Sequence, residues 1–273
     1  MTPAYQGRAL LRQPPRRPPG RIGRIVKALG VLAVIAALAH VPWGSIRRHV
    51  LTVSDIRVRG LHYLDDSTVV RQSGLQRGTD WLDADLPRAR QALLADSRIR
   101  EAQVKRVLPS AIELDITERV PVLLARHGSP WELDGEGVLL EPLGAGVVAD
   151  VPMLTGVDVE RYRAGTCVAT AEVKRGLAWV RATAAPELEL AGRISEIDVS
   201  KGDETGLVLM SGTRVVSSAW PPDVRRLSAL RVVLADLEHR GRAAQEVDLR
   251  FKNQVIVRPA VDAPSGDAAS RSS

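Results

Sequence analysis

Side chains that could carry catalysis or bind a metal are scattered along this sequence and form no known pattern. None of the five histidines has another histidine three or four residues away, and Cys167 is the single cysteine. Zinc ligands normally recur at short, fixed spacings, so we expect no metal site and no cofactor. We interpret Cys167 as a structural thiol. The histidines are His40, His49, His62, His127 and His239.

Asp134 and Glu136 come nearest to a pair of carboxylates that could act as acid and base. A glycine follows each of them, and this pattern favours a solvated turn over a catalytic pair. Phosphate-binding loops of the Walker or Rossmann type are missing, as is a Gly-x-Ser-x-Gly elbow. The sequence therefore predicts that the protein is not an enzyme, and an exported enzyme remains the alternative.

Positive charge is concentrated at the N-terminus. The formal net charge is +6, yet residues 1–27 hold seven basic side chains and no acidic one. The remaining 31 basic and 32 acidic side chains leave the rest of the chain close to neutral. Because phosphate recognition needs a basic surface on the folded body, we expect no nucleic-acid partner.

An apolar segment follows these basic residues. Residues 28–46 contain no Asp, Glu, Lys or Arg, and a helix of this length spans roughly 28 Å, which predicts one transmembrane helix. By the positive-inside rule, residues 1–27 form a disordered cytoplasmic tail and the rest of the chain lies outside the cytoplasm. Two alternatives are a signal sequence cleaved after Ala37-Leu38-Ala39 and a buried core helix.

The region beyond the apolar segment predicts an α+β fold in two domains. In residues 51–121, strand-like alternation is followed by two helical segments and a hairpin, which is the order β-α-α-β-β with two helices on one face of a sheet. Leu82 and Leu93 share the apolar face of the second helix. Residues 122–259 change to short strands with two helices, and residues 260–273 form a polar tail predicted to be disordered. The strands expected in this second domain include 194–199, 206–210, 214–216, 245–249 and 253–257.

This combination resembles the FtsQ/DivIB family of bacterial cell-division proteins over roughly residues 28–258. Residues 51–121 are similar to a POTRA domain, and Glu118-Arg119-x-Pro121 is the most specific part of the match. The chain departs from the family pattern at Arg98-Ile99, where a tryptophan is often found, and this departure leaves a partner contact there open. Further similar segments are Leu133-Asp134-x-x-Gly137, Pro152-x-Leu154-x-Gly156, the helix at 226–237 and Val247-Asp248-Leu249-Arg250-Phe251.

The resemblance implies a non-enzymatic scaffold of the division machinery. Such a protein is a single-pass protein of the plasma (inner) membrane at the division septum, with its POTRA and β domains in the periplasm. It bridges cytoplasmic and periplasmic division proteins and recruits FtsB- and FtsL-like partners. A polypeptide-transport POTRA protein is the alternative, but no series of strands long enough for an outer-membrane barrel follows.

The last strand is the predicted partner-binding site. A final strand bounded by a disordered tail is expected at a sheet edge, where free N–H and C=O groups can pair with a partner strand. In the family, an extended segment of FtsB adds to the sheet there, and by position the strand would run from Lys252 to Val257. Alternatively, Leu249 and Phe251 belong to the core and Arg250 caps an internal aspartate. The site residues are Arg250, Phe251, Lys252, Asn253, Val255, Ile256 and Val257.

Overall fold

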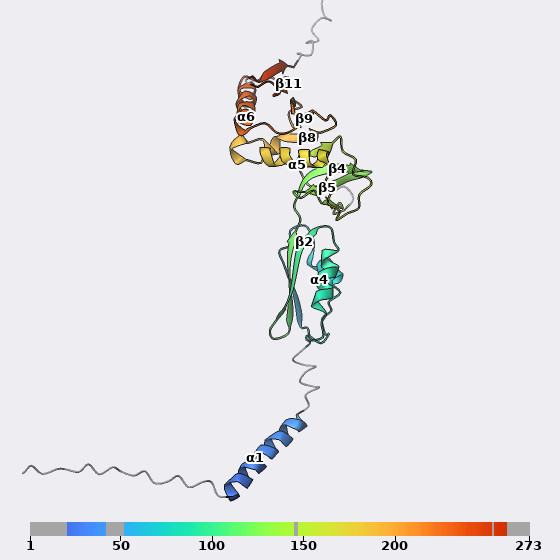
Figure 1. Ribbon diagram of the computed structural model, residues 1–273, viewed down its shortest axis with the longest axis vertical. Coiled ribbons are helices and arrows are strands. Elements are labelled where there is room, and N and C mark those ends of the chain that lie inside the picture. The colour runs from blue at the N-terminus through green and yellow to red at the C-terminus, as the bar shows by residue number, and fades with distance from the viewer. Residues whose placement is uncertain (1–20, 42–51, 145–146, 253, 261–273) are drawn as a thin grey trace, which may run out of the picture. The chain divides into compact units, whose positions relative to one another are not determined.

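The computed structural model describes residues 21–41, 52–144, 147–252 and 254–260. It divides into two compact units, residues 1–52 and 53–273. The first unit contains helix α1, Arg21–His40, drawn in blue in Figure 1. The second contains a three-stranded sheet and a nine-stranded sheet. We refer to residues 53–118 as the first module and to residues 121–260 as the second module.

Helix α1 is long and apolar enough to cross a membrane once. None of its 18-residue apolar window, Gly23–His40, is buried, so the interpretation as a buried core helix is wrong. The helix begins at Arg21, which corrects the predicted tail because residues 21–27 are helical. It ends at His40, two residues before Pro42, since proline disfavours a helical conformation at the residue before it. The predicted helical residues 42–46 and the expected tail residues 1–20 lie outside the described residues.

The first module has the predicted β-α-α-β-β order. Its sheet has the strand order β1-β3-β2, with β1 parallel to β3 and β2 antiparallel to it. Asp65 accepts the amide hydrogen of Thr68 and so begins α3, and Gly74 ends that helix at a φ of 68°. The elements are β1 Asp55–Arg59, α3 Asp66–Ser73, α4 Leu86–Leu94, β2 Ile99–Val107 and β3 Ala111–Glu118.

Leu82 lies outside helix α4, so its predicted place on the apolar helical face is wrong. Asp85 caps the helix by accepting the amide hydrogen of Arg88, and the helix therefore begins at Leu86. Leu93 is buried as predicted, whereas Leu82 is 51% exposed.

The second module is built on a mixed sheet of nine strands in the order β12-β11-β10-β9-β8-β7-β4-β5-β6. Strand β10 is parallel to β11, and β7 is parallel to both of its neighbours. The strands are β4 Pro121–His127, β5 Ser129–Asp134, β6 Leu139–Leu140, β7 Met153–Thr155, β8 Ile194–Asp198, β9 Glu204–Leu209, β10 Arg214–Ser218, β11 Ala244–Asp248 and β12 Ile256–Pro259.

Two helices, α5 (Ala171–Thr183) and α6 (Val224–His239), share one apolar core with this sheet. Trp179 of α5 and Leu227 of α6 are both buried in that core. Short 3₁₀ turns at Pro186–Leu188 and Ala191–Arg193 join α5 to β8. The predicted α+β fold is confirmed, whereas the division at residue 121 stays a prediction because both modules belong to one compact unit.

Candidate partner-binding edge

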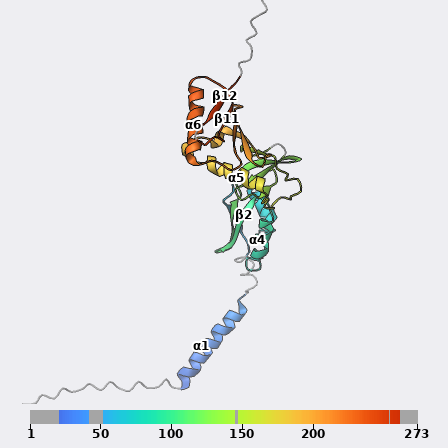
Figure 2. The same ribbon diagram turned by 45° about the horizontal axis from the view of Figure 1, so that its top comes forward.

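Strand β12 is the outermost strand at one end of the nine-stranded sheet. It pairs on one side with β11 in an antiparallel ladder that joins Val247 to Val257 and Asp248 to Ile256. Among the described residues no strand lies beyond it. Figure 2 shows β12 beside β11 and close to α6, at the end of the second unit far from β2. The ladder groups on its outer side are therefore available to a further strand.

The direction of each amide along β12 follows from the ladder. Ala260 donates its amide hydrogen to the carbonyl oxygen of Ala243. Because amides alternate in direction along a strand, those of Arg258 and Ile256 face β11 and that of Val257 faces outward. Pro259 has no amide hydrogen, so Val257 is the outward donor within β12. The bond at Ala260 also shows that the ordered chain continues one residue beyond the predicted boundary.

The strand begins four residues later than predicted, at Ile256 instead of Lys252. Arg226 of α6 explains the shift, because its guanidinium donates to the carbonyl oxygens of Leu249 and Lys252 at 3.2 and 2.8 Å. These bonds hold the segment after β11 against the helix instead of along the sheet. Asn253 lies outside the described residues, and Val255 directly precedes the strand.

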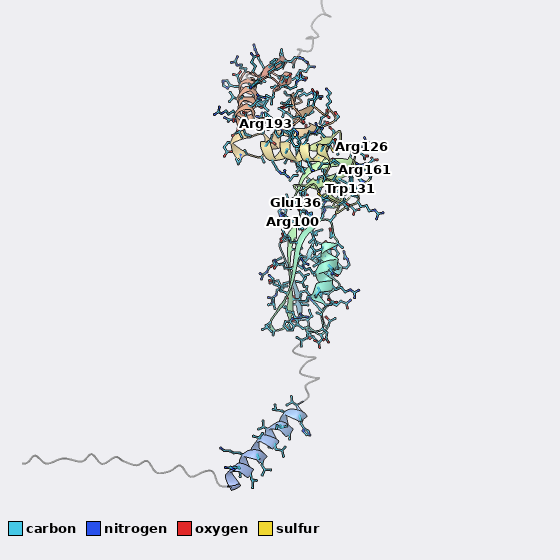
Figure 3. All side chains as sticks on the ribbon, in the orientation of Figure 1. Arg100, Arg126, Trp131, Glu136, Arg161 and Arg193 are labelled. Carbon is cyan, nitrogen blue, oxygen red and sulfur yellow. The ribbon has the colours of Figure 1, made fainter. Side chains whose placement is uncertain are left out.

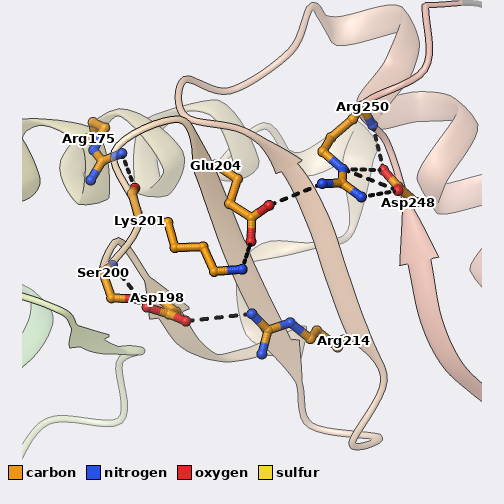
Figure 4. A network of polar contacts seen from close by, with 8 residues as sticks. All are labelled: Arg175, Asp198, Ser200, Lys201, Glu204, Arg214, Asp248 and Arg250. Atoms are coloured by element: carbon orange, nitrogen blue, oxygen red, sulfur yellow. Dashed lines mark hydrogen bonds and ion pairs between the residues drawn. The ribbon is translucent and has the colours of Figure 1, made fainter.

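Arg250 is held by acidic groups of its own chain, as Figure 4 shows. Its guanidinium donates to Asp248 at 2.7 Å and to Glu204 at 3.1 Å. The hydrogen bond from Arg250, opposed by partial burial, holds the pKa of the Asp248 carboxyl below its ordinary value. Glu204 also accepts a bond from Lys201. Arg250 therefore pairs with an internal aspartate, as the alternative interpretation of this segment expected.

Apolar side chains are nevertheless exposed along this edge. Leu249 is buried in the core, but Phe251 and Ile256 are 49% and 43% exposed. Val255 and Val257 pack partly against the core. A hollow of about 320 Å³ lies between the first turns of α6 and residues Lys252, Gln254 and Val255. The edge thus combines unpaired backbone groups with an apolar surface and the basic side chains that border the hollow, which are Arg225, Arg226 and Lys252.

Glu118, from the most specific motif of the sequence, accepts backbone hydrogen bonds within the first module. Its carboxylate accepts the amide hydrogens of His62, Tyr63 and Leu64 at 2.9, 2.7 and 2.9 Å. The side chain is therefore needed to fix the connection between β1 and α3 at the end of β3. The sequence identified the motif but not these hydrogen bonds, because the residues that donate them lie more than 50 positions away from Glu118.

Arg98 and Arg119 join the first module to the second. Arg98 contacts Glu132 at 2.7 Å, with side chains only 5% and 1% exposed. Arg119 contacts Asp134 at 2.6 Å and Glu136 at 3.0 Å. Arg100 pairs with Glu136 on the surface, where Figure 3 labels both residues. Arg98 is therefore a buried structural residue in this chain.

The predicted turn at Asp134 is present, but Asp134 itself is buried. One carboxylate oxygen accepts the amide hydrogens of Glu136 and Val138, and the other accepts a hydrogen bond from Arg119. Both oxygens of the carboxylate are therefore engaged in structural bonds, one within the turn and one with Arg119. Within the described part of the chain, no three histidine, cysteine or acidic residues are grouped so as to hold a metal ion. Cys167 is exposed and unpaired with another cysteine.

Comparisons with known proteins agree with this architecture. Residues 51–119 match the family model of the POTRA domain, FtsQ-type. Along most of its length the chain is similar to proteins named cell division protein FtsQ. The cell division protein FtsQ of Geobacter sp. (strain M21) is 26% identical, over 91% of this chain and 94% of that protein. FtsQ of Myxococcus fulvus is 27% identical over 82% of this chain and 80% of its own length. FtsQ of Anaeromyxobacter sp. (strain K) is 28% identical over 82% and 75%.

The chain is accordingly a division-related POTRA protein. The three relatives named above are all called cell division proteins. The relatives match along most of the chain, so the similarity extends beyond the POTRA domain into the second module. Among the described residues, α1 is the one helix that is long and apolar enough to cross a membrane, which fits a protein that crosses it once.

Proposed function

We propose that this protein is a non-enzymatic scaffold of the division machinery that presents β12 to a partner. The observation that supports this most directly is the free outer side of β12, where the Val257 amide faces away from the sheet. An extended segment of an FtsB-like protein would add there as a tenth strand. FtsL-like proteins would join the same assembly through the FtsB-like partner.

The side chains around β12 would select that partner. Ile256 projects from the strand, and Phe251 lies exposed just before it, so both can bury apolar area against a partner. Arg250 is anchored by Asp248 and Glu204 while its side chain stays 47% exposed. Because these ion pairs already fix its conformation, the exposed part of the guanidinium can bind a partner carboxylate with little further loss of side-chain entropy. Lys252, Asn253 and Val255 complete the proposed site.

The membrane helix would hold this surface at the site of septum formation. We assign residues 1–27 to the cytoplasmic side and both modules to the periplasm, because the seven basic side chains all precede the uncharged apolar segment that starts at residue 28. A retained α1 bridges the cytoplasmic and periplasmic parts of the division machinery.

Depletion of the protein should give filaments with segregated chromosomes and unfinished septa, and a fluorescent fusion should gather at midcell. A fusion that stays evenly distributed in dividing cells would contradict this assignment.

Two proline substitutions test the edge directly. Val257→Pro removes the outward amide and should weaken binding of the FtsB-like partner at least about tenfold, the effect of about 1.4 kcal/mol. Ile256→Pro removes an amide that faces β11 and should instead lower the melting temperature. Binding is measured by titration of the purified proteins and folding by thermal unfolding. Full-strength binding by a folded Val257→Pro variant would exclude strand addition at this edge.

A charge substitution with a matched control separates the edge from general surface effects. Ile256→Glu should reduce partner binding, because it places a carboxylate within the proposed apolar contact. Met210→Glu makes the same kind of change at a side chain that is 70% exposed, next to β9 and away from β12. It should leave binding unchanged. Equal losses in both variants would count against the proposed site.

A further inference from the structure

We propose that the end of the POTRA domain that carries Leu82 and Leu108 rests on the outer surface of the membrane, with both leucines inserted into the lipid. We call this end, formed by residues 53–54, 78–84 and 106–110, the leucine end. The proposal goes beyond partner binding at β12, and it rests on the proposed membrane crossing of α1. The proposed binding partner of the leucine end is the lipid bilayer.

Three chain segments meet at the leucine end. Val53 donates its amide hydrogen to the carbonyl oxygen of Thr79 at 2.8 Å, and Gly78 donates to the carbonyl oxygen of Val53 at 2.9 Å. Ser54 donates to the carbonyl oxygen of Ser110 at 2.9 Å. The turn between β2 and β3 therefore lies beside the point where the chain enters the domain. That turn forms the lower end of the domain in Figure 1.

Both leucines are exposed at this end. Hydrogen bonds from Arg106 hold together the two chain segments that carry them. Leu108 is 78% exposed and Leu82 is 51% exposed. The guanidinium of Arg106, at the end of β2, donates to the carbonyl oxygens of Trp81, Leu82 and Ala84 at 2.9, 2.9 and 2.8 Å. These bonds tie the loop that carries Leu82 to the hairpin that carries Leu108. The two exposed leucines thus belong to segments that are held at the same end of the domain.

The length of the connection to α1 limits how far this end can move from the membrane. His40 ends α1, and Val53 is 13 residues further along the chain. A fully extended chain of that length reaches no more than about 47 Å. Because residue 53 lies at the leucine end itself, this end can move no further than that length from the end of α1. Two leucines bind a membrane only weakly alone, but tethering raises their effective concentration at its surface.

The charges around the leucine end indicate apolar insertion instead of attraction to anionic lipid. Arg77 pairs with Asp55 at 3.5 Å, and Lys105 pairs with Asp115 at the same distance. Arg106 is bonded to backbone carbonyl groups. Asp80 and Asp83 lie within residues 78–84 and Asp85 directly follows, so this end has no excess of positive charge. We therefore expect contact with zwitterionic and anionic bilayers alike, and no strong dependence on salt.

Depth measurements on the full-length protein in lipid vesicles test the proposal. Cys167→Ser removes the single cysteine, and Leu108→Cys, Met210→Cys or Val34→Cys then carries an environment-sensitive fluorophore. Lipids with a nitroxide at a shallow or a deep position quench a fluorophore at the matching depth. We expect the Leu108 probe to be quenched more by shallow than by deep nitroxides, at roughly 5–10 Å below the surface. The Met210 probe should remain unquenched, and the Val34 probe should be quenched by deep nitroxides.

The outcomes separate this proposal from the membrane crossing. An unquenched Val34 probe would show that α1 does not cross the bilayer, so both proposals would fail. A quenched Val34 probe with an unquenched Leu108 probe would overturn the leucine end alone. Leu82→Asp should abolish quenching at Leu108 while the melting temperature stays unchanged, because Leu82 is exposed. Quenching at Leu108 that disappears at high lipid-to-protein ratio would indicate contact with a second copy and would also overturn the proposal.

Discussion

Breaking the Arg98–Glu132 pair should destabilise the protein far more than breaking a surface pair. Both side chains are almost fully buried, and one carboxylate oxygen of Glu132 contacts Arg98 at 2.7 Å. The other oxygen accepts the amide hydrogen of Ala149 at 2.9 Å. Arg98 also donates to the carbonyl oxygen of Glu141, while its second terminal nitrogen is buried without a partner among the described residues. Glu132→Ala would therefore leave a buried guanidinium whose charge is not compensated.

The expected cost follows from this burial. Removing one partner of a buried ion pair costs about 3–5 kcal/mol, because the remaining charge stays desolvated. For a protein of this size, such a loss lowers the melting temperature by roughly 6–20 °C. The double variant Arg98→Met with Glu132→Leu removes both desolvated charges and should recover most of the loss. Arg100→Ala is the matched control, since its pair with Glu136 is half exposed and should contribute at most about 1 kcal/mol.

Urea unfolding of the four variants, followed by circular dichroism, gives the free energies of unfolding. The reasoning predicts a large loss for Glu132→Ala and for Arg98→Ala, a small loss for Arg100→Ala and a partial or full recovery in the double variant. Losses below about 1 kcal/mol in the single variants would refute it, because a buried charge without a partner cannot be tolerated so easily. A double variant as unstable as the sum of the single changes would also refute it.

Three further changes test other contacts. Glu118→Gln replaces a carboxylate that accepts three amide hydrogens, and it should cost about 1.5–3 kcal/mol in urea unfolding. Gly60→Ala should cost about 2–5 kcal/mol, because the residue has a φ of 82° and a Cβ would collide with the Ile116 carbonyl oxygen. Asp248→Asn should lower stability at pH 7, because the folded-state pKa of Asp248 is depressed, chiefly by the hydrogen bond from Arg250. The difference from the unsubstituted protein should persist above the unfolded pKa of about 3.9 and shrink as the pH falls through the lower folded value.

Local patterns in the sequence were enough to predict most elements of the fold. The β-α-α-β-β order of the first module follows from alternation, helical spacing and capping residues such as Asp65 and Gly74. Strand β4 was not foreseen, because Leu123, Leu124 and Ala125 are all buried and so show no polar alternation. The predicted strand at the C-terminus was displaced because Arg226, from a helix far back in the chain, binds the carbonyl oxygen of Lys252.

The sequence by itself determined the apolar helix α1, the class of fold and the presence of a final strand, because charge asymmetry and hydrophobic period are local properties. Only the tertiary structure decided which distant groups meet. It brought Arg98 against Glu132, Arg250 against Glu204, and the loops of Leu82 and Leu108 to one end of a domain. These contacts depend on which strands pair and which turns face each other, and no short stretch of sequence records those long-range choices.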